Sequence, residues 1–224
     1  MNLVKVIEPL LSTWGYKQDA GDWDIQLPAA FVCSSSKEQK KAYCTAITIT
    51  LDAFSSLIKA YKISILSMSN SGCKGNTVIF EHQHTEDYED YIARVFKAID
   101  NYSNEIYEIE IKFDLHAYIY TKENYDKPIL SWVRYVEKSI AIGEFNISIS
   151  TEDDEPYIGF RIEHTLFYPS SLQNNNEDNT ELFELNQPLL EKALKNWEKK
   201  FNSEIEADGL TGVYKYGYLP QDQW

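Results

Sequence analysis

The sequence predicts an α+β fold, with a mainly antiparallel sheet or sheets and helices packed on one face. Residues 109–119 alternate apolar and polar side chains, which is the pattern of an antiparallel strand with one wet face. Apolar side chains between 190 and 205 recur at helical spacing instead. Strands and helices follow one another without the strict βαβ alternation of a doubly wound fold, which favours the α+β class.

The first hundred residues divide into helical and alternating segments. The apolar spacing of 3–14 predicts a helix that ends at Gly15, and the β-branched alternation of 43–51 predicts a strand. Asp52 is expected to cap a following helix. In chain order the predicted elements are helix 3–14, strand 23–27, strand 43–51, helix 54–61, strand 63–68, strand 77–80 and helix 88–99. The turn residues between 70 and 76 join two of these strands.

The second half predicts a hairpin and a long helix. Strands 140–150 and 157–168 flank the turn 152–156, while 129–136 fits a strand or a helix. The polar segment 169–180 is expected to be a mobile surface loop. Asn186 should open the long helix, with Pro188 in its first turn and Gly209 just past its end. The aromatic tail 210–224 is expected to add one strand.

The chain has 224 residues and a formal net charge of -14. We divide it into an N-terminal α+β half, 1–104, and a half with the acidic antiparallel sheet and C-terminal helix, 105–224, which could form one continuous domain. The first half has a net charge of -2 and the second of -12. This balance disfavours nucleic acid and anionic membrane surfaces as partners, and it permits a basic protein.

Cysteine content and hydropathy indicate the compartment. The three cysteines, Cys33, Cys44 and Cys73, form no C-x-x-C pair, so inert thiols in a reducing compartment are expected. The N-terminus carries Lys5 and Glu8 within its apolar pattern, unlike a signal peptide, and no apolar run is long enough to span a membrane. These features predict a cytoplasmic protein.

One candidate metal site lies in the segment Glu81-His82-Gln83-His84. On a strand His82 and His84 would point the same way, and Glu86 or Asp87 could add a carboxylate. That set would suit a metal-dependent hydrolase, with His116 as a further candidate ligand. The competing interpretation is a pair of surface histidines where a strand ends and a helix begins.

Two other segments carry titratable groups in suggestive positions. Asp100 followed by Glu110-Ile111-Lys112 resembles the active-site signature of restriction-endonuclease-like nucleases, which implies a divalent metal and a lysine that supports the attacking water. An ion pair between Glu110 and Lys112 is the simpler interpretation. His164 falls on an apolar strand face, where a core histidine satisfied by a backbone group is expected.

The second half combines carboxylates with many tyrosines, which are favoured at interface cores. Surrounding carboxylates would steer a basic partner. The predicted partner-binding residues are Glu108, Glu110, Asp114, Tyr118, Tyr120, Glu152, Asp153, Asp154 and Glu155.

The leading hypothesis is a binding protein without a catalytic site or cofactor. It would be a cytosolic inhibitor, of the type of a bacterial immunity protein, that masks a basic toxin or nuclease through an acidic, aromatic-rich face. One alternative is the hydrolase centred on His82 and His84. Another is a structural or adaptor domain of a larger assembly.

Overall fold

The computed structural model describes residues 3–6, 16–68, 74–121, 123–124, 126–135, 142–149, 155–171, 177–209 and 212–223. Within these residues nine strands form one sheet: β1 (Leu3–Val6), β2 (Tyr16–Gln26), β3 (Ile58–Met68), β4 (Lys74–Glu81), β5 (Ile106–Ile119), β6 (Ile129–Tyr135), β7 (Gly143–Ser148), β8 (Tyr157–His164) and β11 (Ile205–Gly209). The main helices are α1 (Ser36–Ala53), α2 (Tyr88–Asp100) and α3 (Thr180–Phe201). Short 3-10 helices are η1 (Ala29–Phe31), η3 (Thr165–Phe167) and η4 (Gln221–Gln223). Two small ribbons pair β9 (Ser170–Ser171) with β10 (Glu177–Asp178), and β12 (Val213–Tyr214) with β13 (Gly217–Tyr218).

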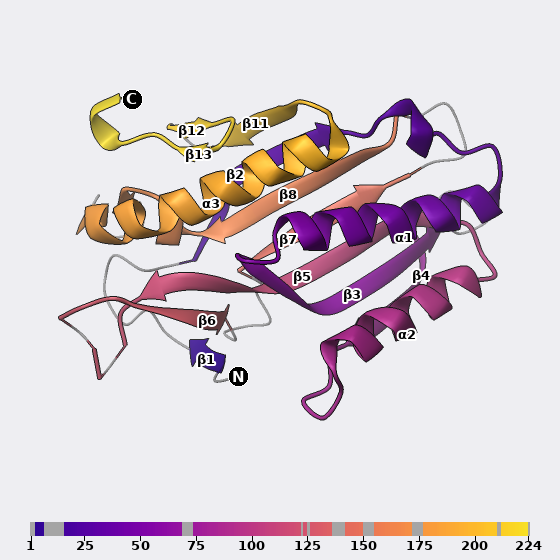
Figure 1. Ribbon diagram of the computed structural model, residues 1–224, viewed down its shortest axis with the longest axis horizontal. Helices are drawn as coiled ribbons and strands as arrows, with labels where there is room; N and C mark the ends of the chain where they lie inside the picture. The colour runs from indigo at the N-terminus through magenta and orange to yellow at the C-terminus, as the bar shows by residue number, and fades with distance from the viewer. Residues whose placement is uncertain are drawn as a thin grey trace.

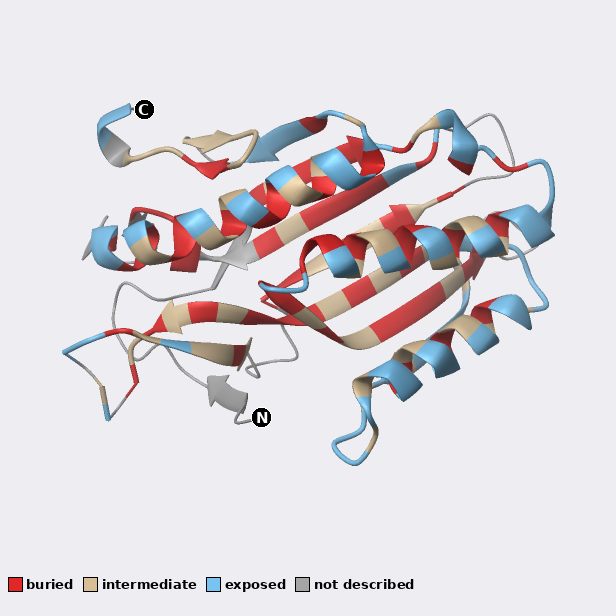
Figure 2. Ribbon diagram, viewed as in Figure 1, coloured by how far each residue is buried: buried red, intermediate tan, exposed pale blue. Residues whose placement is uncertain are grey.

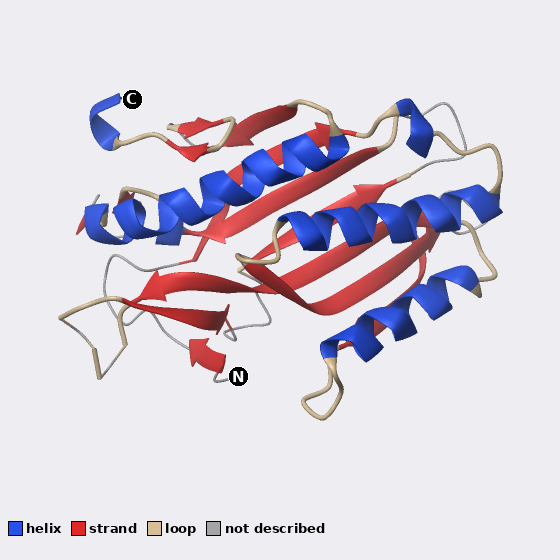
Figure 3. Ribbon diagram, viewed as in Figure 1, coloured by secondary structure: helices blue, strands red, loops and turns tan. Residues whose placement is uncertain are grey.

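The sheet has the strand order β1-β6-β5-β7-β8-β2-β11, and β3 pairs with both β5 and β4. The pairings are antiparallel except for β1 with β6. The long helices cross one side of the sheet (Figures 1 and 3), with α1 in contact with both α2 and α3. The α+β prediction is confirmed. No described helix is long and apolar enough to cross a membrane.

The core lies between the sheet and the helices. Figure 2 shows buried positions along the helix faces that meet the sheet and exposed positions on their outer faces. At its centre Phe54, which follows α1, packs 5.0 Å from Phe145, 4.7 Å from Phe160 and 5.6 Å from Trp197 between ring centroids. Each ring is fully buried, and burying a side chain of this size contributes about 1.5–3 kcal/mol.

Strands from both sequence halves enter this sheet. From residues 1–104, β2 pairs with β8 and β3 pairs with β5, and both partner strands come from 105–224. The aromatic core is shared in the same way, because Trp23 on β2 contacts Phe160 on β8 at 5.6 Å.

Several predicted elements are confirmed. The alternating segment 109–119 lies in β5, and its apolar positions are fully buried on the helix side. The helix predicted at 88–99 is α2, and strands 23–27, 63–68, 77–80, 140–150 and 157–168 overlap β2, β3, β4, β7 and β8. The ambiguous segment 129–136 is the strand β6. The turns 70–76 and 152–156 lie largely outside the described residues.

The strand predicted at 43–51 is wrong, because this segment lies within α1. The helix buries Tyr43, Ala46, Ile47 and Thr50, whose spacing of three and four places them on one helical face. Ser35 caps the helix by accepting a hydrogen bond from the Glu38 N–H at 3.3 Å. The apolar and β-branched residues of this segment fit both the two-residue period of a strand and the period of a helix. Burial of the helical face against the sheet stabilises the helix.

Two predicted helices are also wrong. Residues 54–57 form a turn that leads into β3, so the predicted helix 54–61 does not exist and Asp52 lies inside α1. Leu3–Val6 forms a strand parallel to β6, and the remainder of the predicted helix 3–14 lies outside the described residues. In both cases pairing with a neighbouring strand overrides the local helical pattern.

The C-terminal helix begins six residues earlier than predicted. Asn186 lies in the middle of α3, fully buried, rather than at its start, and Pro188 is also inside the helix. The Asn186 side-chain amide accepts a hydrogen bond from the Tyr118 N–H at 2.7 Å and donates one to the Tyr118 carbonyl at 3.0 Å. It therefore pairs with the β5 backbone as a neighbouring strand would. The helix ends at Asn202 in the left-handed conformation, and Gly209 instead ends β11.

The loop and tail differ in detail from the expectation. Within 169–180, β9 and β10 pair, while 172–176 lies outside the described residues. The tail forms the β12–β13 ribbon instead of one strand, and Trp23 donates to the Tyr214 carbonyl at 2.9 Å.

Candidate functional site: the open face of the sheet

The side of the sheet opposite α1 and α3 is called here the open face. On β5 it is formed by the residues between the buried positions, namely Glu108, Glu110, Lys112, Asp114, His116 and Tyr118. The predicted docking residues of β5 therefore do share one face. Two of their carboxylates, however, form ion pairs within the sheet: Asp114 with Arg134 and Glu110 with Lys112.

Asp114 is held by a close ion pair rather than offered to a partner. It is 4% exposed, and both of its oxygens accept hydrogen bonds from Arg134 on β6, at 2.6 and 2.8 Å. The Arg134 guanidinium also lies 4.0 Å from the centre of the Tyr61 ring. Burial raises the pKa of the Asp114 carboxyl, and the hydrogen bonds from Arg134 oppose that rise. This pair is part of the sheet structure.

Glu110 is also close to a cation. Lys112 lies 3.5 Å from Glu110 and 3.6 Å from Glu144 on β7. The segment that resembles a nuclease signature thus contains the ion pair expected in the simpler interpretation. In this part of the open face one lysine lies between two carboxylates.

The predicted tyrosines pack against the fold. Tyr118 is half-buried against the core, and the Tyr120 hydroxyl donates to Glu181 in the first turn of α3. Glu155 is exposed at the start of the hairpin's second strand, whereas Glu152, Asp153 and Asp154 lie outside the described residues.

A second set of carboxylates lies at the far side of the open face, where β2 pairs with the edge strand β11. Register places Asp22 opposite Asp208 and Asp24 opposite Glu206. We call these four residues the acidic edge. Apart from Ile205, the side chains of β11 are exposed (Figure 2). Directly opposed like charges destabilise an antiparallel pair, so this arrangement opposes folding.

Arg161 lies beside the acidic edge. Arg161 on β8 donates from two nitrogens to Oδ2 of Asp22, at 3.2 and 3.1 Å. Partial burial raises the pKa of Asp24 to about 6, with Asp22, Glu206 and Asp208 adding to the rise and Arg161 opposing it. Counting only the side chains that the structure describes, the acidic edge has four carboxylates beside one arginine.

The backbone beside Asp24 leaves room for its carboxylate. Gly159 is its cross-strand neighbour on β8, and a Cβ there would lie 2.9 Å from Asp24 Oδ1. Next to it is a hollow of about 260 Å³, lined by Asp24, Gln26, Tyr157, Glu204 and Glu206. Carboxylates beside a partly exposed tyrosine ring suit a guanidinium or ammonium group.

The three histidines whose side chains are described, His82, His84 and His116, do not form a metal site. His82 donates from Nε2 to the Glu86 carbonyl at 2.9 Å and packs against Tyr91, with 5.2 Å between ring centroids, whereas His84 is exposed in a turn. His116 stacks on Trp132 at 4.8 Å. Among the described residues no group of three histidine, cysteine or acidic side chains is placed to hold a metal ion. The His164 side chain lies outside the described part of the chain.

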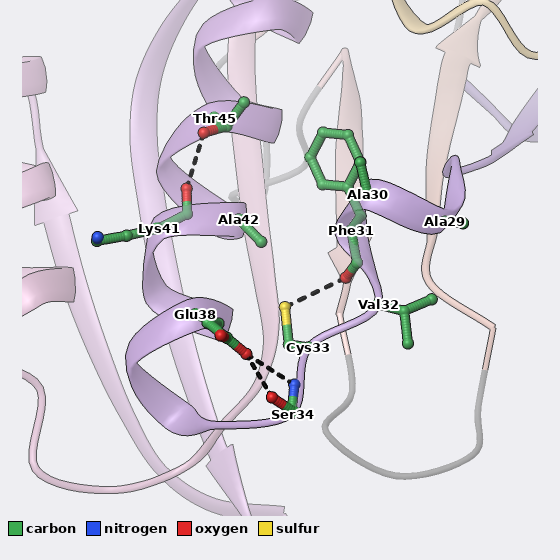
Figure 4. Close-up of a pocket in the computed structure, with 10 residues that line it drawn as sticks. All are labelled: Ala29, Ala30, Phe31, Val32, Cys33, Ser34, Glu38, Lys41, Ala42 and Thr45. Atoms are coloured by element: carbon green, nitrogen blue, oxygen red, sulfur yellow. Dashed lines mark hydrogen bonds between the residues drawn. The ribbon is translucent and has the colours of Figure 1, made fainter.

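A larger groove of about 700 Å³ lies between η1 and α1 (Figure 4). Its polar groups bond one another: the Cys33 thiol donates to the Phe31 carbonyl at 3.2 Å, and the Ser34 hydroxyl donates to Glu38 at 2.7 Å. Burial raises the pKa of the Cys33 thiol, which opposes thiolate formation. The groove therefore lacks an activated nucleophile.

The sequence interpretation overlooked the acidic edge, although each strand showed half of it. Asp22 and Asp24 alternate on one strand, as do Glu206 and Asp208 on another, so each pair had to share a face. Their pairing joins positions about 180 residues apart, which periodicity does not reveal. The chain matches no protein-family model, no curated protein and no solved structure, so geometry and charge alone support a functional proposal.

Proposed function

We propose that this chain binds a basic protein through the acidic edge and masks it, as an immunity-type inhibitor masks a basic toxin or nuclease. The observation that carries the proposal is the register of β2 and β11, which opposes Asp22 to Asp208 and Asp24 to Glu206. Such pairs oppose folding, and a bound cationic partner would relieve their repulsion.

The geometry of the hollow supports a cationic side chain as the contact. Asp24, Glu204 and Glu206 supply acceptors, and Tyr157, a residue that is 39% exposed, supplies an aromatic face. Lysine or arginine would meet both features. A nuclease toxin fits this partner class, because binding nucleic acid requires a basic surface.

The test is affinity capture from a lysate of the source cell, with mass spectrometry, at low and high salt. We expect one stoichiometric basic protein whose capture weakens as salt rises. The Glu206→Lys variant should lose it. A matched control is Glu184→Lys, which makes the same charge change at an exposed position of α3.

Three results would refute the proposal: capture of no basic protein at either salt concentration, equal loss in both variants, or undiminished capture by Glu206→Lys. Equal loss would indicate a response to total charge rather than to the acidic edge.

A further inference from the structure

The other end of the sheet has a different kind of edge. In the described sheet β4 pairs with β3 alone, at the opposite side from β11 (Figure 1). Its six central residues, 75–80, carry no charge and no proline. Natural sheets usually protect an edge with charges, proline or a very short strand. Eight-residue β4 has none of these between its end residues.

β4 also exposes apolar side chains on both faces of the sheet. Val78 is 38% exposed on the side of the helices, and Ile79 is 52% exposed on the open face. A helix docked on one face would cover only one of them. An added strand would extend both faces and would pair with the backbone of the edge.

From these features we infer that the chain forms a two-fold dimer through antiparallel pairing of β4 with β4 of a second copy. When the two-fold axis passes beside Val78, this residue lies opposite Val78 of the other copy. Thr77 of each copy then lies opposite Ile79 of the other. β-Branched residues are the most favourable strand pairs, so the segment is complementary to itself on both faces.

The charges at the two ends of β4 complement those of a second copy when the strands are antiparallel, although the copies repel one another overall. Lys74 begins β4 and Glu81 ends it, so antiparallel pairing brings the basic end of each strand towards the acidic end of the other. A parallel arrangement would place like charges together. A highly charged partner would find no complementary charge along 75–80. Arg94 already binds the Glu81 carbonyl at 3.1 Å, which leaves the centre of the strand as the pairing segment.

Salt separates this dimer from the basic-partner complex. Each copy has a net charge of -14, so the two copies repel one another and screening should strengthen the dimer. Binding of a basic protein should weaken instead. The dimer does not depend on the proposed function, because it uses the opposite edge of the sheet.

The experiment is sedimentation equilibrium of the full chain over a range of protein concentrations at low and high salt. We expect a monomer–dimer equilibrium that tightens with salt, and a dissociation constant raised by roughly tenfold or more in Val78→Lys. Leu130→Lys is the control, since Leu130 is a 42% exposed apolar residue on β6 and its replacement should leave the constant unchanged.

Cross-linking gives an independent readout of the register. Val78→Cys should form a symmetric intermolecular disulfide under mild oxidation more readily than Ile79→Cys, while the parent chain under the same conditions controls for its native thiols. A monomer at every concentration and salt, or a dimer equally strong in Val78→Lys, would overturn the inference. A dimer in which Ile79→Cys cross-links faster than Val78→Cys would overturn the register.

Discussion

Two aspartate–arginine pairs on the open face differ in what surrounds them. Arg134 binds both oxygens of Asp114, whose side chain is 5% exposed, and its guanidinium covers the Tyr61 ring. Arg161 binds a single oxygen of Asp22, and both side chains are more exposed, at 34% and 26%. The first pair is enclosed by the sheet, whereas the second lies beside three further carboxylates. Among the described residues, the Asp114 charge is neutralised by the fold, whereas the acidic edge holds more carboxylates than cations, as the proposed binding of a basic partner requires.

The largest difference should appear when each arginine is removed. Arg134→Met leaves a buried carboxylate without its cation, so we expect the free energy of unfolding to fall by about 3 kcal/mol. Arg161→Met should change it by less than about 1 kcal/mol, because solvent screens an exposed pair. Urea denaturation of both variants measures the two changes.

Lowering the pH provides the control for the Arg134→Met prediction. Protonated Asp114 carries no charge, so the loss in Arg134→Met should shrink as the pH falls below the pKa of that carboxyl. If both arginine variants lost the same free energy at every pH, the distinction between the two pairs would be wrong.

The next effect concerns Asp24, whose folded-state pKa is about 6 against an ordinary value of 3.8. A carboxyl with a raised folded-state pKa contributes stability that is fully present below pH 3.8 and is lost as the pH rises through about 6. The Asp24→Asn variant has no carboxyl at this position, so it should not lose this stability as the pH rises. Because solvent screens the exposed carboxylate, we expect a gain of about 1 kcal/mol at neutral pH.

The measurement is urea denaturation of Asp24→Asn and the parent chain at about pH 4 and about pH 7. The two curves should nearly coincide at the lower pH and separate at the higher one. A variant less stable than the parent at neutral pH would show that the Asp24 carboxylate has stabilising contacts that outweigh its repulsion.

The fold shows which sequence signals were decisive. β5 was predictable because its alternation continues over eleven residues, so that no helical arrangement could bury Ile109, Ile111 and Phe113 together. Residues 43–51 were not, since Tyr43, Ile47 and Thr50 fit a helix face while the same segment also alternates. The capping sequence from Ser35 to Glu38 was the local signal for the helix.

The acidic edge was less accessible to sequence reasoning than the fold. Net charge by halves assigned the acidity to residues 105–224, yet Asp22 and Asp24 come from the first half. Likewise, the Asp114 carboxylate on β5 appeared available because its partner Arg134 is distant in sequence. Strand register determines which charges are neutralised, and it depends on long-range pairing.

The smallest predicted changes in the free energy of unfolding should have opposite signs at the acidic edge and on β5. Glu206→Gln removes one of two directly opposed carboxylates and should raise the free energy of unfolding by about 0.5 kcal/mol. Glu110→Gln removes one of two carboxylates near Lys112 and should lower it by about 0.3 kcal/mol, since Glu144 remains. Urea denaturation at low salt measures both, and high salt should reduce each difference because it screens exposed charges. Equal signs for the two variants would mean that total charge, rather than its placement by strand register, controls the stability of the open face.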